Sequence, residues 1–159
     1  LVILPVAVPA SLLTMGLIRM WSHLPGDLVL GRLPMLLLAH VGRLLPFAVV
    51  VQVIYLRRVD RQLFDAALVP DVGWARRLRS VYLPLMAPAL LASLGLVFVL
   101  SLGELGASLL AVPPGTSTLP LRMFNLLHYG AGGEVAALAL TTAAIVTAAL
   151  AITARVIRQ

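Results

Sequence analysis

Four long apolar runs alternate with three polar connections along the chain. The runs cover residues 1–21, 33–56, 83–112 and 135–157. A helix needs roughly 20 residues, rising 1.5 Å each, to cross about 30 Å of hydrocarbon. Every run is long enough for one crossing. The pattern therefore predicts an all-α fold, a polytopic helical membrane protein with about four transmembrane helices.

The amino-acid composition indicates that the solvent of this protein is a lipid bilayer. Of the 159 residues, 61% are hydrophobic and only 11% are charged, and the mean hydropathy is +1.05. Soluble domains have roughly 45–50% apolar and 25% charged residues. So few charged groups cannot cover a globule of this size in water, whereas lipid accepts apolar surface directly. An ordinary water-soluble domain is excluded.

The positive charge is distributed as it is beside membrane spans. The net charge is +6, and all twelve basic residues are Arg. Half of them lie in the connection at residues 57–82, namely Arg57, Arg58, Arg61, Arg76, Arg77 and Arg79. The positive-inside rule makes this connection cytoplasmic, and Arg155 and Arg158 return to the same side after two more crossings. We therefore expect contact with membrane lipid and no nucleic-acid partner.

The cytoplasmic connection is longer than a passive link, because loops between neighbouring helices commonly take 2–8 residues. Asp60 can cap a helix over residues 61–68, and a turn at residues 71–73 can precede a second short helix over residues 74–81. The first helix carries an apolar stripe with no partner in its own loop, made of Leu63, Phe64, Ala67 and Leu68. Two interpretations stay open. The helix either lies on lipid headgroups or docks into a groove of a partner protein.

The same connection resembles the E-A-A-x3-G loop of permease subunits of ATP-binding-cassette (ABC) importers, which work with a substrate-binding protein. Asp65-Ala66-Ala67 matches the acidic-Ala-Ala element, and Leu83-Pro84 follows at the family's spacing. The sequence departs from the pattern by Asp in place of Glu, and by Asp71 at the usual Gly position, with Gly73 two residues later. In that family the loop forms two short helices seated in a cleft of the ATPase subunit. The resemblance implies an ATPase-coupling loop that includes Leu63, Phe64, Asp65, Ala66, Ala67, Leu68, Asp71, Gly73, Leu83 and Pro84.

Two further stretches, residues 102–108 and 113–122, resemble the branch of this family that contains ferric iron, thiamine and sulfate permeases. The family core has five spans, so the resemblance implies a single transmembrane domain over residues 1–159 without its first core helix, from a C-terminal half or a fragment. It also implies an external loop at residues 113–134. The implied location is the bacterial inner or plasma membrane.

The same resemblance implies a mechanism and a set of partners. The partners are a cytoplasmic ATP-binding subunit, a periplasmic or extracellular substrate-binding protein, and a second permease half or an identical partner. The implied function is a permease component that forms part of a translocation path and works by alternating access. The transported substrate is left open.

The candidate residues of the translocation path are three ionisable residues of the second and third predicted runs: His40, Arg43 and Glu104. A central Arg costs roughly 2.5–3.5 kcal/mol on insertion scales, so Arg43 is expected to face protein or water. His40 precedes it by three residues and shares its helix face. Glu104 lies near the outer boundary between Gly103 and Gly106, where the helix is expected to open. These side chains line an outward-facing vestibule of the translocation path, form a helix-packing ion pair, or extend to the membrane interface.

Motifs for catalysis or metal binding are missing from the sequence. The chain has no Cys and no Lys, so it has no Walker-type G-x-x-x-x-G-K-[ST] loop, and its three His are not paired at i, i+4. We expect no cofactor, no metal site and no enzymatic activity in this chain. Two other interpretations stay open. One is a membrane enzyme acting on a lipid-linked substrate through Glu104, His40 and His128, and the other is a non-transport scaffold whose basic loop binds anionic lipid.

Overall fold

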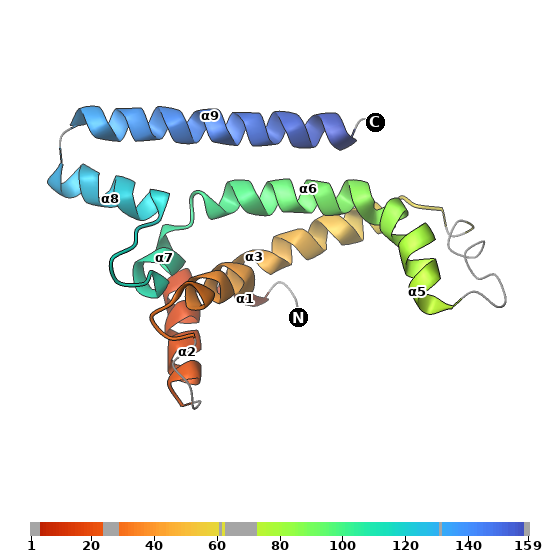
Figure 1. Cartoon of the computed structure of the whole chain (residues 1–159), viewed down its shortest axis with the longest axis horizontal. Helices are drawn as coiled ribbons and strands as arrows, with labels where there is room; N and C mark the ends of the chain where they lie inside the picture. The colour runs from red at the N-terminus through yellow and green to blue at the C-terminus, as the bar shows by residue number, and fades with distance from the viewer. Residues whose placement is uncertain (1–3, 24–28, 61, 63–72, 131, 158–159) are drawn as a thin grey trace.

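The computed structural model describes residues 4–23, 29–60, 62, 73–130 and 132–157, and the regular structure in these ranges is helical throughout, which confirms the all-α prediction. The helices are α1 (Leu4–Ala7), α2 (Ala10–Ser22), α3 (Leu33–Leu56), α5 (Trp74–Arg77), the π-helix η1 (Leu78–Tyr82), α6 (Leu83–Ser101), α7 (Leu105–Ala111), α8 (Leu119–Tyr129) and α9 (Gly132–Ile157). Figure 1 shows α3, α6 and α9 as the three longest elements.

In the described ranges, three helical stretches are long and apolar enough to cross a membrane: Leu33–Leu56, Trp74–Ser101 and Gly132–Arg155. Each overlaps one of the predicted runs. The first predicted run, residues 1–21, folds as the shorter helices α1 and α2. Pro9 separates these two helices, and its backbone ψ of 137° lies outside the helical region. The helix does not continue through Pro9 because the proline ring is bulky and its nitrogen has no hydrogen to donate.

The third predicted run, residues 83–112, contains two helices. The spanning helix α6 ends at Ser101, and α7 starts at Leu105. Glu104 is the N-cap of α7, and its carboxylate accepts a hydrogen bond from the Ala107 amide at 3.1 Å. A carboxylate at a helix N-terminus binds unpaired amides and is favoured by the helix dipole. The helix opening expected beside Gly103 is confirmed.

The short helix expected over residues 74–81 is not separate from the following span. The backbone stays helical through Tyr82, at φ −67° and ψ −46°, so α5, η1 and α6 run on without a break. Pro84 lies in the first turn of α6, directly after the π-helix. Prolines and π-bulges are the usual causes of helix bends. Figure 1 shows the result, a bend between α5 and α6 in place of the predicted break at Leu83-Pro84.

The connection at residues 113–134, expected as an external loop, contains a helix. Thr118 is extended, at φ −85° and ψ 160°, and α8 begins at Leu119 with Pro120 in its first turn. Proline suits this position because its fixed φ is already helical and the missing N–H would have no partner there. The expected external loop is therefore wrong in part, because residues 119–129 of this segment are helical. The last span also starts earlier than predicted, at Gly132.

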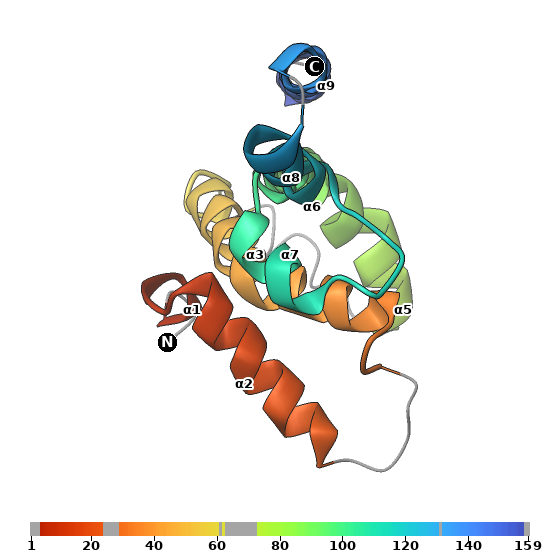
Figure 2. The ribbon, with the colours of Figure 1, turned by 90° about the vertical axis from the view of Figure 1, so that its left-hand side faces the viewer.

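The buried core lies where α2, α3 and α7 meet. It is built from Met35, Leu36 and Ala39 of α3 with Ala107 and Ala111 of α7. The small residues allow close approach of the helices, as is usual in membrane proteins. The end-on view in Figure 2 shows α2 running away from the long helices at a steep angle, and α7 packs against both α2 and α3.

Helix α9 lies on the opposite side of α6 from α3 (Figure 2). A Cβ added at Gly95 of α6 would overlap the side chain of Thr153 of α9, so these two helices approach closely there. Thr153 donates its hydroxyl hydrogen to Ala149 O at 2.8 Å, which satisfies the hydroxyl within its own helix. Gly95 has no side chain at this crossing, which allows α6 and α9 to pack this closely.

Candidate functional site

Arg43 joins α3 to the end of α1. Its Nη1 atom lies 2.9 Å from Pro5 O, 3.0 Å from Val6 O and 2.7 Å from Val8 O, and donates to these carbonyls. The last carbonyls of a helix have no partner inside it, and they form the negative end of its dipole. The guanidinium therefore satisfies several unpaired carbonyl groups at once with a complementary charge.

Glu104 faces Arg43 from the start of α7. Arg43 Nε lies 3.9 Å from Glu104 Oε2, and the two side chains are 21% and 15% exposed. The other carboxylate oxygen is the one that caps α7, and Ser108 donates its hydroxyl to the Glu104 carbonyl at 2.7 Å. We call Arg43, Glu104 and the carbonyls of residues 5, 6 and 8 the Arg43 clasp. It joins three elements that are distant in the sequence.

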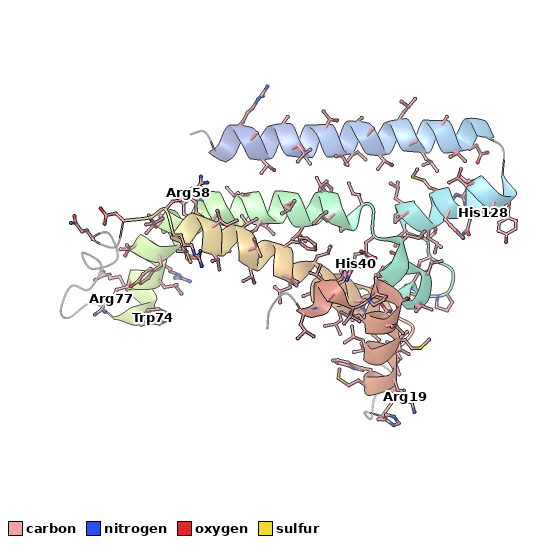
Figure 3. The ribbon with its side chains drawn as sticks, turned by 180° about the vertical axis from the view of Figure 1, so that it is seen from behind. Arg19, His40, Arg58, Trp74, Arg77 and His128 are labelled. Carbon is pink, nitrogen blue, oxygen red and sulfur yellow. The ribbon has the colours of Figure 1, made fainter. Side chains whose placement is uncertain are left out.

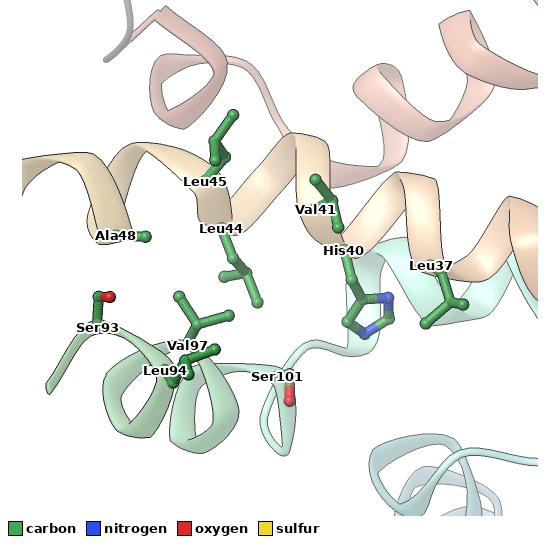
Figure 4. A pocket seen from close by; sticks show the side chains of 10 residues that line it. All are labelled: Leu37, His40, Val41, Leu44, Leu45, Ala48, Ser93, Leu94, Val97 and Ser101. Carbon is green, nitrogen blue, oxygen red and sulfur yellow. The ribbon is translucent and has the colours of Figure 1, made fainter. Parts of the chain in front are cut away.

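His40 lies on a different surface from the Arg43 clasp. Its Nδ1 is 2.9 Å from Leu36 O, and because a carbonyl only accepts, Nδ1 is the donor in this contact. His40 lines a groove of about 300 Å³ between α3 and α6, seen in Figure 4, and a neighbouring one of about 280 Å³ that reaches Thr118. Neither groove is lined by Arg43 or Glu104.

The structure thus brings Arg43 and Glu104 together and leaves His40 apart. The geometry of the pair is that of the helix-packing interpretation, because both side chains are used in binding backbone groups. The acid/base trio of the enzyme interpretation is not assembled in this structure. His128 donates to Phe124 O at 2.8 Å on α8, and its ring contacts Phe124 and Tyr129.

Most of the predicted coupling loop lies outside the described residues, including Leu63, Phe64, Asp65, Ala66, Ala67, Leu68 and Asp71. Three members are described. Gly73 is the N-cap of α5 in an extended conformation, and Leu83 and Pro84 form the first turn of α6. Figure 3 shows Trp74 and Arg77 on α5, at the opposite end of the long helices from His128.

Polar contacts between α3 and α6 were not predicted. Gln52 Nε2 donates to Ser93 Oγ at 3.1 Å, and Tyr55 donates to Leu85 O at 3.0 Å. Ser93 is 5% exposed and also donates to Leu90 O at 2.9 Å. Polar side chains inside apolar helices commonly bond across to a neighbouring helix. Polar residues such as Gln52 and Ser93 within otherwise apolar runs are the sequence signal from which these contacts could have been predicted.

These observations define the class of the protein. The part of the chain that the structure describes has three helices of spanning length, an apolar exterior and an intramembrane Arg bound to carbonyls. These are features of a multi-pass helical membrane protein. The whole chain, residues 1–159, matches the family described as "Binding-protein-dependent transport system inner membrane component". The chain belongs to this family, whose members are multi-pass inner membrane permeases of ABC importers.

Curated relatives agree with the family. The chain is 33% identical over 142 residues to the 2-aminoethylphosphonate transport system permease protein PhnV of Salmonella typhimurium. The aligned region covers 89% of this chain and 53% of PhnV. It is 35% identical over 106 residues to the spermidine/putrescine transport system permease protein PotC of Escherichia coli, covering 65% of this chain and 39% of PotC. The chain thus spans about half the length of PhnV. Both relatives are named as transport permeases and not as enzymes.

Proposed function

We propose that this chain forms part of the translocation path of an ABC importer and couples that path to a separate cytoplasmic ATPase subunit. The observation that carries the proposal is the family match over residues 1–159, with relatives named as permeases of two solute transport systems. The proposed partners are the ATPase, an external substrate-binding protein, and a second permease half or an identical copy.

The continuous helix from Trp74 to Ser101 supports a coupling role for the loop before it. This helix starts directly after Gly73 and spans 28 residues. Its far end is followed by Glu104, which is the α7 partner of Arg43. Packed helices transmit displacement because interiors are dense and resist compression. We propose that movement of the loop by the ATPase is passed along this continuous helix toward the Arg43 clasp, whose Glu104 lies three residues after the last residue of the helix, Ser101.

We propose that the path runs along the groove between α3 and α6 that His40 lines. The Arg43 clasp would then stabilise the packing of α3 against α1 and α7. The groove in Figure 4 supports this, since His40, Ser93 and Ser101 are its polar groups on otherwise apolar walls. The ferric iron, thiamine and sulfate branch stays our proposal for the substrate class. Uptake assays that compare ferric iron, thiamine and sulfate with 2-aminoethylphosphonate test this proposed substrate class.

The decisive experiment is co-purification of the permease with candidate ATPase subunits, repeated with Phe64→Asp combined with Ala67→Arg. We expect the wild type to retain one ATPase and the double variant to lose both the ATPase and substrate uptake. Leu127→Asp is the control, because Leu127 is a 66% exposed apolar residue on α8, and it should leave ATPase binding unchanged. If the wild type retains no ATPase, or the double variant keeps both binding and uptake, the proposal fails.

A further inference from the structure

A second groove between α3 and α6 lies at the basic end of the spans. It has a volume of about 200 Å³, and its lining includes Val51, Ile54, Tyr55, Arg58, Pro88 and Ala92. The walls are apolar apart from two groups. The Tyr55 hydroxyl is used in its bond to Leu85 O, so the Arg58 guanidinium is the charged group that this groove presents.

Arg58 has no counter-ion among the described residues. Its side chain is exposed, and no described carboxylate lies within ion-pair distance of it. Arg57, Arg76 and Arg79 are exposed at the same end of the long helices and add further positive charge. The Asp60 carboxylate accepts the Gln62 amide at 3.0 Å. This end of the structure is therefore complementary to an anion.

The depth of the groove suits a lipid. It runs from Arg58, just after the end of α3, to Val51, which is roughly 10 Å of helix. Trp74 is 68% exposed, and its ring lies 5.7 Å from that of Tyr82. Exposed Trp and Tyr rings gather at the level of lipid headgroups, where Arg side chains also meet phosphates. A positive charge at headgroup level, next to an apolar groove, matches the charged headgroup and apolar acyl chain of an anionic phospholipid.

We propose that this groove binds one anionic glycerophospholipid, with its phosphate on Arg58 and one acyl chain between α3 and α6. The charge favours an anionic lipid over a zwitterionic one, because each Arg near the surface attracts anionic lipid but gains little from a neutral headgroup. The apolar walls favour a lipid over a free phosphate ion, which has no group to place against Val51 and Ile54. The site shares no residue with the His40 groove, and Arg58 lies at the start of the 57–82 connection, ahead of the residues from Leu63 to Leu68 that are proposed to contact the ATPase.

The test uses the whole permease that contains this chain, reconstituted in vesicles of equal parts phosphatidylglycerol and phosphatidylcholine. Native mass spectrometry then counts the phospholipids that remain bound after extraction. We expect retention of phosphatidylglycerol over phosphatidylcholine, with the preference lowered about fivefold by Arg58→Gln. Arg19→Gln is the matched control, an exposed Arg at the far end of α2, and should leave the preference unchanged.

A second pair of variants tests the groove independently of charge. Ala92→Leu narrows the groove below Arg58 and should lower the retention of both lipids. Ala48→Leu narrows the His40 groove instead and should leave lipid retention unchanged. Equal retention of the two lipids, or equal losses with Arg58→Gln and Arg19→Gln, would overturn the proposal. So would displacement of the lipid by millimolar inorganic phosphate, or a protein segment retained there in place of lipid. ATPase binding and uptake are read separately, so failure here leaves the transport proposal standing.

Discussion

Substituting Arg43 separates the two interactions that the Arg43 clasp combines. Arg43 Nη1 lies 2.7–3.0 Å from the carbonyl oxygens of residues 5, 6 and 8. This nitrogen carries only two hydrogens, so the three contacts amount to at most two full charge-assisted hydrogen bonds at the end of α1. Removing them leaves α1 carbonyls and the Glu104 carboxylate without their partner. We expect Arg43→Leu to lower the free energy of unfolding by about 3–5 kcal/mol.

The companion variant, Glu104→Gln, should cost much less. The 3.9 Å separation from Arg43 Nε is longer than a hydrogen bond, and the pair keeps some solvent contact. A glutamine oxygen can still accept the Ala107 amide at 3.1 Å, so the cap of α7 survives. We expect a loss of about 1–2 kcal/mol, because only the charge is removed.

The measurement is equilibrium unfolding of the purified protein in mixed micelles for wild type, both single variants and the double variant. The reasoning predicts that Arg43→Leu costs at least twice as much as Glu104→Gln. Arg122→Leu, at an exposed position on α8, should stay within about 0.5 kcal/mol of wild type. Equal costs for both single variants, with no further loss in the double variant, would show that the ion pair alone carries the effect and would refute the role assigned to the α1 carbonyls.

Three further predictions concern helix packing. Gly95→Val should destabilise the α6–α9 crossing by about 1–3 kcal/mol by colliding with Thr153, with Thr153→Ala restoring part of the loss in thermal unfolding. Gln52→Met should change the unfolding free energy by less than about 1 kcal/mol, since it removes the bond to Ser93 together with a buried amide oxygen that has no partner among the described residues. Gly106→Val should loosen α7 from α2, seen as faster hydrogen exchange in α7, because an added Cβ already approaches α2 at 3.0 Å.

The order of hydrophobic and polar residues determined the solvent of this protein and the location of its long helices. The predicted runs at residues 33–56, 83–112 and 135–157 each overlap a helix of spanning length, because an apolar stretch in lipid must satisfy its backbone within itself. The opening of the helix beside Gly103 also followed from local sequence. The effect of each proline was harder to predict. Pro9 divides the predicted first span into two helices, whereas the break predicted at Leu83-Pro84 is only a bend between α5 and α6.

Tertiary structure alone decided which intramembrane groups meet. His40 and Arg43 share a helix face by spacing, yet His40 lines the α3–α6 groove while Arg43 reaches carbonyls 35 to 38 residues earlier in the chain. Hydrophobic periodicity reports only the side of a helix that avoids water, and in lipid every side of a spanning helix does so. The partner of a buried charge depends on which helix end is brought within hydrogen-bond distance. That depends on the packing of α1, α3 and α7 and not on the sequence near Arg43.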